Sequence, residues 1–392
     1  MTPSAQRRWA RLVEWVAWQK NRLGKTWAAA RSARAEPGVT AARMLKDLVR
    51  LNARRRPFGV PAYFHYRMFD PSLTPGESAR YLPDSPWANA HLWSLLTPER
   101  YRTLYDNKLV FNRLFRSFGL PLAEIYAVYD PAVGHTMDGR SLKTTEELRE
   151  WLRGFGEGGF VLKPVEGISG FRVLVLKGRS EDDPETFVTL AGERYGADRL
   201  VQFAANTGEL ELHCPDVDPR PFLLEERIRP HPELESFIGP TLCTVRVQTI
   251  IAIDGSPRII AAVFKLQPGT SGVDHLVYGA VGCWVDLETG VLGRGRTRTG
   301  VQYSSVIPGT DTSFIGFELP QWAAVKEAAL RAAAAFPWVR SVGWDVAISH
   351  RGPILVEGNA RWSPSLIQMA APRGLMTGDF EVLCDALART SR

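Results

Sequence analysis

The stretch Val342–Trp362 reads VGWDVAISHRGPILVEGNARW, which is two apolar strands joined by a turn at residues 350–352. Folding of this hairpin brings Asp345 close to Glu357, which follows it by 12 residues. Asn359 stands two residues beyond Glu357, so these two side chains share one face of a strand. The hairpin is therefore expected to gather two carboxylates and one amide at a single place.

This donor set is suited to a hard cation. Carboxylate and amide oxygens are ligands that Mg²⁺ accepts, and Mg²⁺ also takes phosphate oxygens from a substrate. The apolar neighbours of Asp345 and Glu357 predict partly dry surroundings, where carboxylates without a partner are costly. We therefore predict a magnesium site at Asp345, Glu357 and Asn359. The alternative is an exposed hairpin with scattered polar residues and no metal.

A second motif is the stretch FVLKPVEGISGFRVLVL over residues 160–176, which indicates a strand, a glycine-containing loop and a returning strand. Glycines at 167 and 170, with Ser169 between them, allow backbone N–H groups to approach a polyphosphate closely. Lys163 supplies the opposite charge. The motif is not a Walker A loop, because the lysine precedes the glycines. A hairpin turn with a chance lysine explains it equally well when it is read alone.

The stretch FLLEERI over residues 222–228 forms a third motif, an acidic strand end that is soon followed by Pro230 and Pro232. A strand segment that leaves a sheet exposes backbone C=O and N–H groups, which can meet the edge of an adenine. Without other motifs, the segment indicates no more than an acidic strand end.

The charge of the chain is concentrated at its beginning. The whole chain carries +6, but residues 1–60 hold 14 Lys and Arg against 3 Asp and Glu, so the other 332 residues carry −5. Within residues 1–35, Trp, Leu and Val alternate with Arg and Lys, which predicts a basic amphipathic helix, with a second helix from about Thr40 to Asn52. The first helix is expected either to bind an anionic membrane surface or to dock on the body of the protein. Nucleic acid is an unlikely partner because no recognition motif accompanies the charge.

Several protein classes are excluded by composition. No apolar run reaches the roughly 18 residues of a membrane-spanning helix, and the beginning of the chain lacks the pattern of a secretory signal. The cysteines stand far apart without a CxxC pair, which argues against zinc and against a disulfide framework. We therefore expect a cytoplasmic protein, either free or peripheral on the inner face of the membrane. The four cysteines are Cys214, Cys243, Cys283 and Cys384.

The chain divides into segments of different character. Its overall class is predicted to be α+β, with a mainly antiparallel sheet in the C-terminal half. The expected segments are a basic helical segment (1–60), an irregular Pro- and aromatic-rich connector (61–100), a first core part (101–150), a small lobe with the glycine loop (151–230) and a C-terminal lobe with the metal site (231–392).

The order of the motifs is more specific than any one of them. Lys108 after Asp106-Asn107, then Lys163 with its glycine loop, EERI, Arg246 and the Asp345…Glu357-x-Asn359 pattern resemble the ATP-grasp superfamily. The resemblance is closest to the sugar-transfer-associated ATP-grasp proteins, related to alpha-L-glutamate ligase-like proteins, and runs from about 106 to 373. It implies an ATP-grasp fold, in which two α/β lobes clamp ATP.

The resemblance also implies a role for each motif. Lys108 and Lys163 contact phosphates, the glycine loop is a lid, and Arg246 with Lys265 faces the transferred phosphoryl group. Asp345, Glu357 and Asn359 hold Mg²⁺, with two ions expected. The implied nucleotide-binding residues are Lys108, Lys163, Gly167, Ser169, Gly170, Glu225, Glu226, Arg227, Ile228 and His231. Arg246 in a surface salt bridge is the alternative to its catalytic role.

By the same resemblance, the implied activity is an ADP-forming ligation of a carboxylate to an amine or hydroxyl through an acylphosphate, acting on a sugar- or lipid-linked substrate in polysaccharide metabolism. Two alternatives remain: a kinase that phosphorylates an alcohol, and a nucleotide-binding, non-catalytic partner of a membrane glycosyltransferase complex. The chain departs from the family at Cys243 and at Asp274-His275, where the family often has Asn and Asp-Asn. These departures leave the substrate open.

Overall fold

The computed structural model of the chain describes most of its length. Of the predicted basic helix within residues 1–35, only residue 24 and residues 26–35 are described, so the membrane hypothesis falls largely outside this part. Ser169 and Cys214 also lie outside the described residues. The structure describes residues 24, 26–53, 58–156, 158–167, 170–205, 221–297, 302–371 and 373–390.

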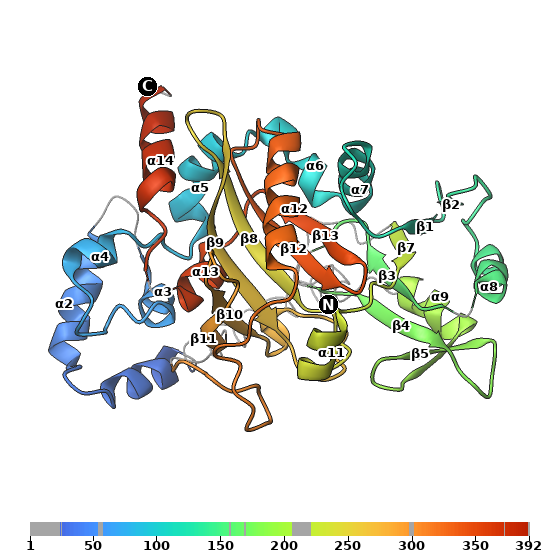
Figure 1. Cartoon of the computed structure of the whole chain (residues 1–392), viewed down its shortest axis with the longest axis horizontal. Helices are drawn as coiled ribbons and strands as arrows, with labels where there is room; N and C mark the ends of the chain where they lie inside the picture. Colours follow the sequence, from blue (N-terminus) through green and yellow to red (C-terminus); the bar gives the residue numbers. More distant parts are fainter. Residues whose placement is uncertain are drawn as a thin grey trace, which may run out of the picture.

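Two antiparallel sheets organise the chain (Figure 1), and the prediction of an α+β class is confirmed. The first sheet has seven strands in the order β2-β1-β7-β3-β4-β5-β6. Helices α8 (Thr145–Gly154) and α9 (Ala197–Ala205) supply Leu148 and Leu200 to its core. Its strands are β1 (Ile125–Tyr129), β2 (His135–Thr136), β3 (Phe160–Pro164), β4 (Leu174–Arg179), β5 (Thr186–Thr189), β6 (Arg194–Gly196) and β7 (Phe222–Glu226).

The second sheet comes from the C-terminal half of the chain and has six strands in the order β11-β10-β9-β8-β12-β13. Its central strands β8 and β12 are buried along their whole length, as expected for the apolar runs that form them. Tight turns at Gly255 and Gly290 join β8 to β9 and β10 to β11, and both glycines adopt a positive φ. The strands are β8 (Thr244–Ile251), β9 (Pro257–Leu266), β10 (Val281–Val285), β11 (Leu292–Thr297), β12 (Ser341–Ser349) and β13 (Gly352–Asn359).

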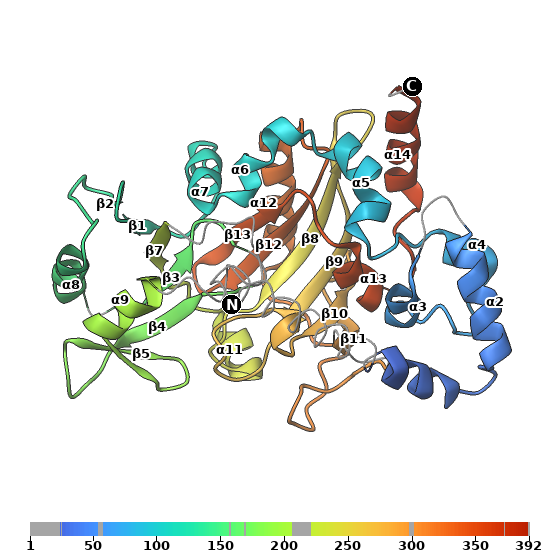
Figure 2. The ribbon, with the colours of Figure 1, turned by 180° about the vertical axis from the view of Figure 1, so that it is seen from behind.

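The two faces of the second sheet are covered differently (Figures 1 and 2). Helix α12 (Trp322–Ala335) packs on one face against strands β8, β9, β12 and β13 and buries Ala329, Ala332 and Ala333 there. On the other face, helix α13 (Pro364–Ala370) and its neighbours cover one end, where Trp362 and Leu366 are buried. Polar and charged side chains occupy the other end of that face, as described below.

The Pro-rich segment 61–100 was expected to be irregular, and this prediction is wrong. It contains three helices, and each has a proline in its first turn. Proline is compatible with this position because the first N–H groups of a helix have no intrahelical partner. The same residue type that interrupts a helix therefore begins one here. The helices are α3 (Val60–His65), α4 (Pro75–Ala79) and α5 (Pro86–Leu96).

The remaining helices connect the two sheets and cover their ends. Helix α2 (Ala41–Asn52) confirms the helix predicted from about Thr40, whose side chain caps it. Residues 99–117 hold three consecutive short helices, η1 (Glu99–Tyr101), α6 (Thr103–Asp106) and α7 (Lys108–Ser117). The others are α11 (Pro232–Ile238), η2 (Leu276–Tyr278) and α14 (Gly378–Thr390). None of the helices in the described part of the chain has the length and apolar character needed to cross a membrane.

Candidate active site

The β12–β13 hairpin places the predicted metal ligands side by side. Asp345 pairs directly with Glu357, and Gly343 pairs with Asn359. The Nδ2 group of Asn359 donates to Glu357 Oε1 at 3.2 Å and to the Gly343 carbonyl at 3.3 Å. The amide oxygen of Asn359 is thus the atom left to face a ligand. The hairpin geometry expected from the sequence is present.

Two cations hold Asp345. Arg246 on β8 is the direct partner of Asp345 across the sheet, and its Nε and Nη2 donate to Oδ1 and Oδ2 at 2.6 and 2.9 Å. Lys265 on β9 adds a contact from Nζ to Oδ2 at 3.2 Å. Asp345 is only 2% exposed. Burial alone would raise its pKa, but Arg246 and Lys265 outweigh this effect and hold the pKa of Asp345 well below its usual range.

Strand register explains why these charges meet. Directly paired residues in a sheet point to the same side, and Arg246 pairs with Val263, two residues before Lys265. Arg246, Lys265 and Asp345 therefore share one face of the second sheet. The sequence prediction that Arg246 and Lys265 lie together on neighbouring strands agrees with this arrangement. The surface salt bridge considered for Arg246 is instead a buried one.

Asp274 is a fourth charged member of this cluster. Its Oδ1 lies 3.2 Å from Lys265 Nζ, and its Oδ2 accepts from the backbone N–H and the hydroxyl of Thr244 at 2.6 and 2.7 Å. Sequence reasoning noted Asp274 only as part of a family departure and gave it no contact. No periodic pattern predicts the position of a residue on a loop, so the sequence carried no signal for this contact.

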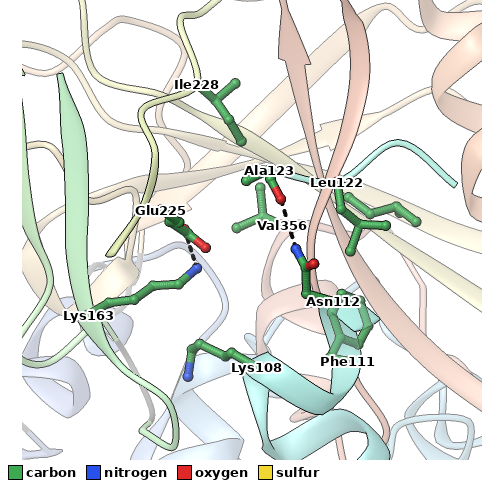
Figure 3. Close-up of a pocket in the computed structure, with 10 residues that line it drawn as sticks. Lys108, Phe111, Asn112, Leu122, Ala123, Lys163, Glu225, Ile228 and Val356 are labelled. Atoms are coloured by element: carbon green, nitrogen blue, oxygen red, sulfur yellow. Dashed lines mark hydrogen bonds and ion pairs between the residues drawn. The ribbon is translucent and has the colours of Figure 1, made fainter. Parts of the chain in front are cut away.

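A second group of charges lies on the first sheet (Figure 3). Lys163 at the end of β3 contacts Glu225 on β7, with 2.5 Å between Nζ and Oε1. Lys163 pairs with Leu223, two residues before Glu225, so the two side chains share a face and are diagonal neighbours. Each residue is 7% exposed. Two residues from separate motifs of the sequence, the glycine-loop strand and the EERI strand, thus form one ion pair.

Lys108 approaches the same group from helix α7. Asn107 caps this helix by accepting from the Val110 N–H at 3.0 Å, and the Lys108 N–H donates to the Val165 carbonyl at 3.0 Å. Burial and the positive charge of Lys163 lower the pKa of Lys108, against the opposing effect of Glu357. Lys108 lines one pocket together with Lys163 and with Val356, the residue before Glu357, so it lies near both groups of charges.

The pocket of Figure 3 has apolar walls that the sequence prediction missed. Phe111 and Asn112 stand three and four residues after Lys108 on α7, which is the spacing of one helix face. Asn112 is buried and donates from Nδ2 to the Ala123 carbonyl at 2.8 Å. The helical spacing of Phe111 and Asn112 from Lys108 was the sequence signal that could have predicted their place at the pocket. The lining residues are Lys108, Phe111, Asn112, Leu122, Ala123, Lys163, Glu225, Ile228, Leu355 and Val356.

The described part of the glycine loop lies between the two lobes. The Nζ of Lys108 donates to the Gly167 carbonyl at 3.2 Å. Gly170 has a φ of +72° and lies against Val273, so that a Cβ at this position would come within 2.5 Å of a Val273 methyl. The loop therefore contacts the lobe that carries the carboxylates. Any side chain at Gly170 would disturb both the backbone conformation and this contact.

The EERI segment has mixed surroundings. The Glu226 N–H donates to the Glu124 carbonyl at 2.8 Å, and the Glu226 side chain forms an ion pair with Arg351 of the β12–β13 turn. Arg227 Nη1 reaches the Lys177 carbonyl at 3.5 Å, while Ile228 is buried and lines the pocket. The structure thus places Ile228 and Glu225 at the pocket, whereas the side chains of Glu226 and Arg227 are directed to other partners.

His231 is placed as a helix cap. Its Nδ1 accepts from the Glu233 N–H at 3.4 Å, and its own N–H donates to the Ile348 carbonyl at 2.9 Å. It begins α11 and does not belong to the lining residues of the pocket in Figure 3. Among the implied nucleotide-binding residues, His231 is therefore one that does not line this pocket with the lysines.

The predicted magnesium ligands fit a divalent cation by their chemistry. Asp345 and Glu357 are direct partners across the β12–β13 hairpin and share one face of the sheet, and two neighbouring carboxylates repel unless a cation or a proton lies between them. Within the described residues, no group of three or more His, Cys, Asp and Glu side chains is arranged for a metal. The candidate set therefore depends on the Asn359 amide as its third ligand, a donor that Mg²⁺ accepts.

The family of the chain is now defined. The model of the sugar-transfer associated ATP-grasp family matches residues 88–381. This match covers three quarters of the chain, so the chain belongs to this family. The resemblance predicted from the order of the motifs is thereby confirmed. No curated protein matches the chain.

Solved structures show weaker likenesses. D-cycloserine synthetase is 15% identical, covering 85% of this chain and 94% of that chain at a TM-score of 0.42. A biotin carboxylase complex from Campylobacter jejuni is 13% identical, covering 66% and 41% at 0.37. The D-alanine-D-alanine ligase from Coxiella burnetii is 12% identical, covering 74% and 60% at 0.37. The chain spans about half the length of several such structures. These likenesses are too weak to carry an argument about function.

Proposed function

We propose that this protein is an ATP- and Mg²⁺-dependent ligase that joins a carboxylate to an amine or hydroxyl through an acylphosphate. One observation carries the proposal: charged residues from both sheets lie around or beside one pocket. Lys163 comes from the first sheet, and Lys108 from helix α7, which packs on the core of the second sheet. Glu357 directly follows the lining residue Val356 on β13, and Asp345 and Asn359 lie beside it in the same hairpin. Membership of an ATP-grasp family supports ATP as the ligand between them.

Each side suits a different part of the nucleotide. The ammonium groups of Lys108 and Lys163 are donors for phosphate oxygens, and they are strongest where water is excluded. The apolar walls from Phe111, Leu355 and Val356 are suited to pack against the nucleoside. In our proposal, Glu225 orients Lys163 until phosphate arrives. The glycine loop then covers the phosphates and limits hydrolysis by water.

The second lobe supplies the groups for transfer. Asp345, Glu357 and Asn359 would hold Mg²⁺, which neutralises phosphate charge and orients the phosphoryl group when bound. Arg246 and Lys265 stand beside these ligands, so they are placed to stabilise negative charge that spreads over the phosphoryl oxygens during transfer. A substrate carboxylate would attack the γ-phosphorus to give an acylphosphate and ADP. An amine or hydroxyl would then attack the acyl carbon and expel phosphate.

We propose a sugar- or lipid-linked substrate, as in polysaccharide or glycolipid assembly. The description of the family as sugar-transfer associated supports this class. The basic composition of residues 1–35 supports contact with an anionic membrane surface. Flotation with anionic liposomes tests that contact, since a chain lacking residues 1–35 should lose it. Equal flotation of the two proteins would contradict it.

The reaction is tested by ADP release with Mg²⁺-ATP, a pool of amino and sugar acids, and hydroxylamine as a trap. We expect ADP together with a hydroxamate, whose mass names the acid. A stable phosphomonoester without a hydroxamate would instead identify a kinase. ATP binding without any ADP release, with sugar- and lipid-linked acids included in the pool, would favour a non-catalytic partner of a membrane complex.

A further inference from the structure

Lys265 lies between two carboxylates that belong to different parts of the fold. Its Nζ is 3.2 Å from Oδ1 of Asp274, on the loop that follows β9, and 3.2 Å from Oδ2 of Asp345 on β12. Lys265 is 6% exposed. Burial alone would lower its pKa, but Asp274 and then Asp345 outweigh that effect. Both carboxylates therefore help to keep this buried lysine charged.

The position of Asp274 does not depend on Lys265. Its Oδ2 accepts from both the backbone N–H and the hydroxyl of Thr244, and Thr244 is a buried residue at the start of β8. Only Oδ1 of Asp274 turns to the lysine. The carboxylate is thus fixed to the sheet by one oxygen and offers the other to Lys265.

Asp345 is in the opposite situation, because its oxygens are already shared. A carboxylate oxygen has about two acceptor sites, and Oδ2 of Asp345 receives both Arg246 Nη2 at 2.9 Å and Lys265 Nζ at 3.2 Å. The Lys265 contact is the longest of the three hydrogen bonds to Asp345. A cation that binds Asp345 therefore competes first with Lys265.

We propose that Asp274 is a positioning residue, which retains Lys265 at the reaction centre when Asp345 binds a metal ion. This inference rests on the proposed function. Lys265 carries three N–H donors. With Asp274 holding one of them, the donor released by Asp345 can turn to a phosphoryl or acylphosphate oxygen without the lysine leaving the site.

The loop that carries Asp274 also lies beneath the glycine loop. Val273 contacts Gly170, and Gly272 lies against Val175 of β4, where an added Cβ would come within 3.2 Å of the valine side chain. The Thr241 hydroxyl donates to the Gly269 carbonyl at 2.7 Å and fixes the beginning of the same loop. One segment thus contacts both Gly170 of the glycine loop, through Val273, and Lys265, through Asp274.

The test is the binding of Mn²⁺ with ADP, because Mn²⁺ takes the same oxygen ligands as Mg²⁺ and is detected by its spin resonance. In Asp274→Asn, Lys265 keeps Asp345 as its only carboxylate and competes more strongly with the metal. We expect metal affinity to fall on the order of tenfold, the lower end of the effect of losing an outer partner of a metal ligand. Asp254→Asn, in an exposed turn with its own partner Arg258, controls for the loss of one negative charge.

A second variant keeps the proposal testable if Asp274→Asn folds poorly. Lys265→Met removes the competitor of the metal at Asp345. A charge near 4 Å contributes about 1 kcal/mol or more, so we expect Mn²⁺ affinity to rise roughly fivefold. In the double variant Lys265→Met/Asp274→Asn, the effect of Asp274→Asn should vanish. A positioning role requires this dependence on Lys265, whereas a purely structural role of Asp274 predicts the same loss with or without the lysine.

The outcomes separate the inference from the proposed function. If the natural chain binds no Mn²⁺ with ADP, both are wrong. If it binds the metal and Asp274→Asn leaves the affinity unchanged, or lowers it equally in the Lys265→Met background, then only the role of Asp274 is wrong. In Asp274→Asn alone, kcat should fall by a larger factor than the KM for ATP changes, because nucleotide contacts on the first sheet are untouched.

Discussion

The two groups of charges in this site are held in different ways. In the first group, Lys163 on the first sheet is paired with Glu225, and Lys108 on helix α7 donates to the backbone carbonyl of Gly167. On the second sheet, the carboxylate of Asp345 contacts two cations, Arg246 and Lys265, and Lys265 also contacts Asp274. The first group offers donors to an incoming anion. The second group is neutralised internally before any ligand arrives.

This difference has a consequence for binding. Phosphate can add to the lysines of the first group with little rearrangement, since Lys108 gives up only a contact with a carbonyl oxygen. A metal ion at Asp345 must instead replace part of a buried ion-pair network, and the freed cations become available for phosphoryl oxygens. The predictions below separate the two groups, beginning with the largest expected effect.

Asp345→Asn is expected to affect stability most. It leaves Arg246 and Lys265 buried without the carboxylate they share, and removal of one partner of a buried ion pair costs about 3–5 kcal/mol. Chemical denaturation measures the change in the free energy of unfolding. Asp379→Asn is the matched control, because its ion pair with Arg258 is partly exposed and worth about 0–1 kcal/mol. Similar losses in the two variants would contradict the buried network.

Glu357→Gln is expected to separate activity from stability. Glu357 is partly exposed and accepts a hydrogen bond from the neutral amide of Asn359, so unfolding should change by no more than about 0.5–1 kcal/mol. Loss of a metal-binding charge should lower ADP formation by at least about a hundredfold. Steady-state assays with Mg²⁺-ATP measure it. Turnover within a fewfold of the natural chain would remove Glu357 from the metal site.

Lys163→Ala tests the first group. Loss of a charged hydrogen bond to phosphate, worth about 1.5–3 kcal/mol, should weaken ATP binding roughly tenfold to a hundredfold and slow transfer as well. Titration calorimetry with ATP in the absence of Mg²⁺ isolates this group from the metal. Lys163→Arg, which keeps the charge, is the control. Unaltered ATP affinity in Lys163→Ala would show that Lys163 serves only its ion pair with Glu225.

For Lys108, we predict a smaller effect on ATP affinity, and this effect depends on pH. Burial and the neighbouring Lys163 lower the pKa of Lys108 below its ordinary value of 10.5. The protonated form of Lys108 binds phosphate. ATP affinity should therefore have its full value at pH below this lowered pKa and decline as pH rises through it. Arginine remains charged throughout this range, so Lys108→Arg should remove the decline. The same alkaline decline in both proteins would assign it to another group.

The hairpin of the second sheet was predictable because its signal is local. Apolar alternation, a turn and the spacing of Asp345, Glu357 and Asn359 determine which side chains are neighbours once two strands pair. The order of the motifs added the family. Neither argument depends on knowing how the lobes pack.

The remainder of the site could not be predicted because it depends on tertiary placement. The contact of Asp274 with Lys265 depends on the course of a loop, and that of Lys163 with Glu225 on the register between two strands distant in sequence. The prediction of an irregular segment over 61–100 was wrong for a different reason, because proline can both interrupt a helix and begin one. His231 lay in the expected segment but became the cap of a helix.

The central claim is that phosphate donors and metal ligands from two lobes act on one nucleotide. The most direct measurement is ADP affinity with and without Mg²⁺, in the natural chain and in Glu357→Gln. We predict that Mg²⁺ strengthens ADP binding to the natural chain and has little effect in Glu357→Gln, while affinity without Mg²⁺ stays similar. An equal effect of Mg²⁺ in both proteins, or no ADP binding in either, would contradict the account.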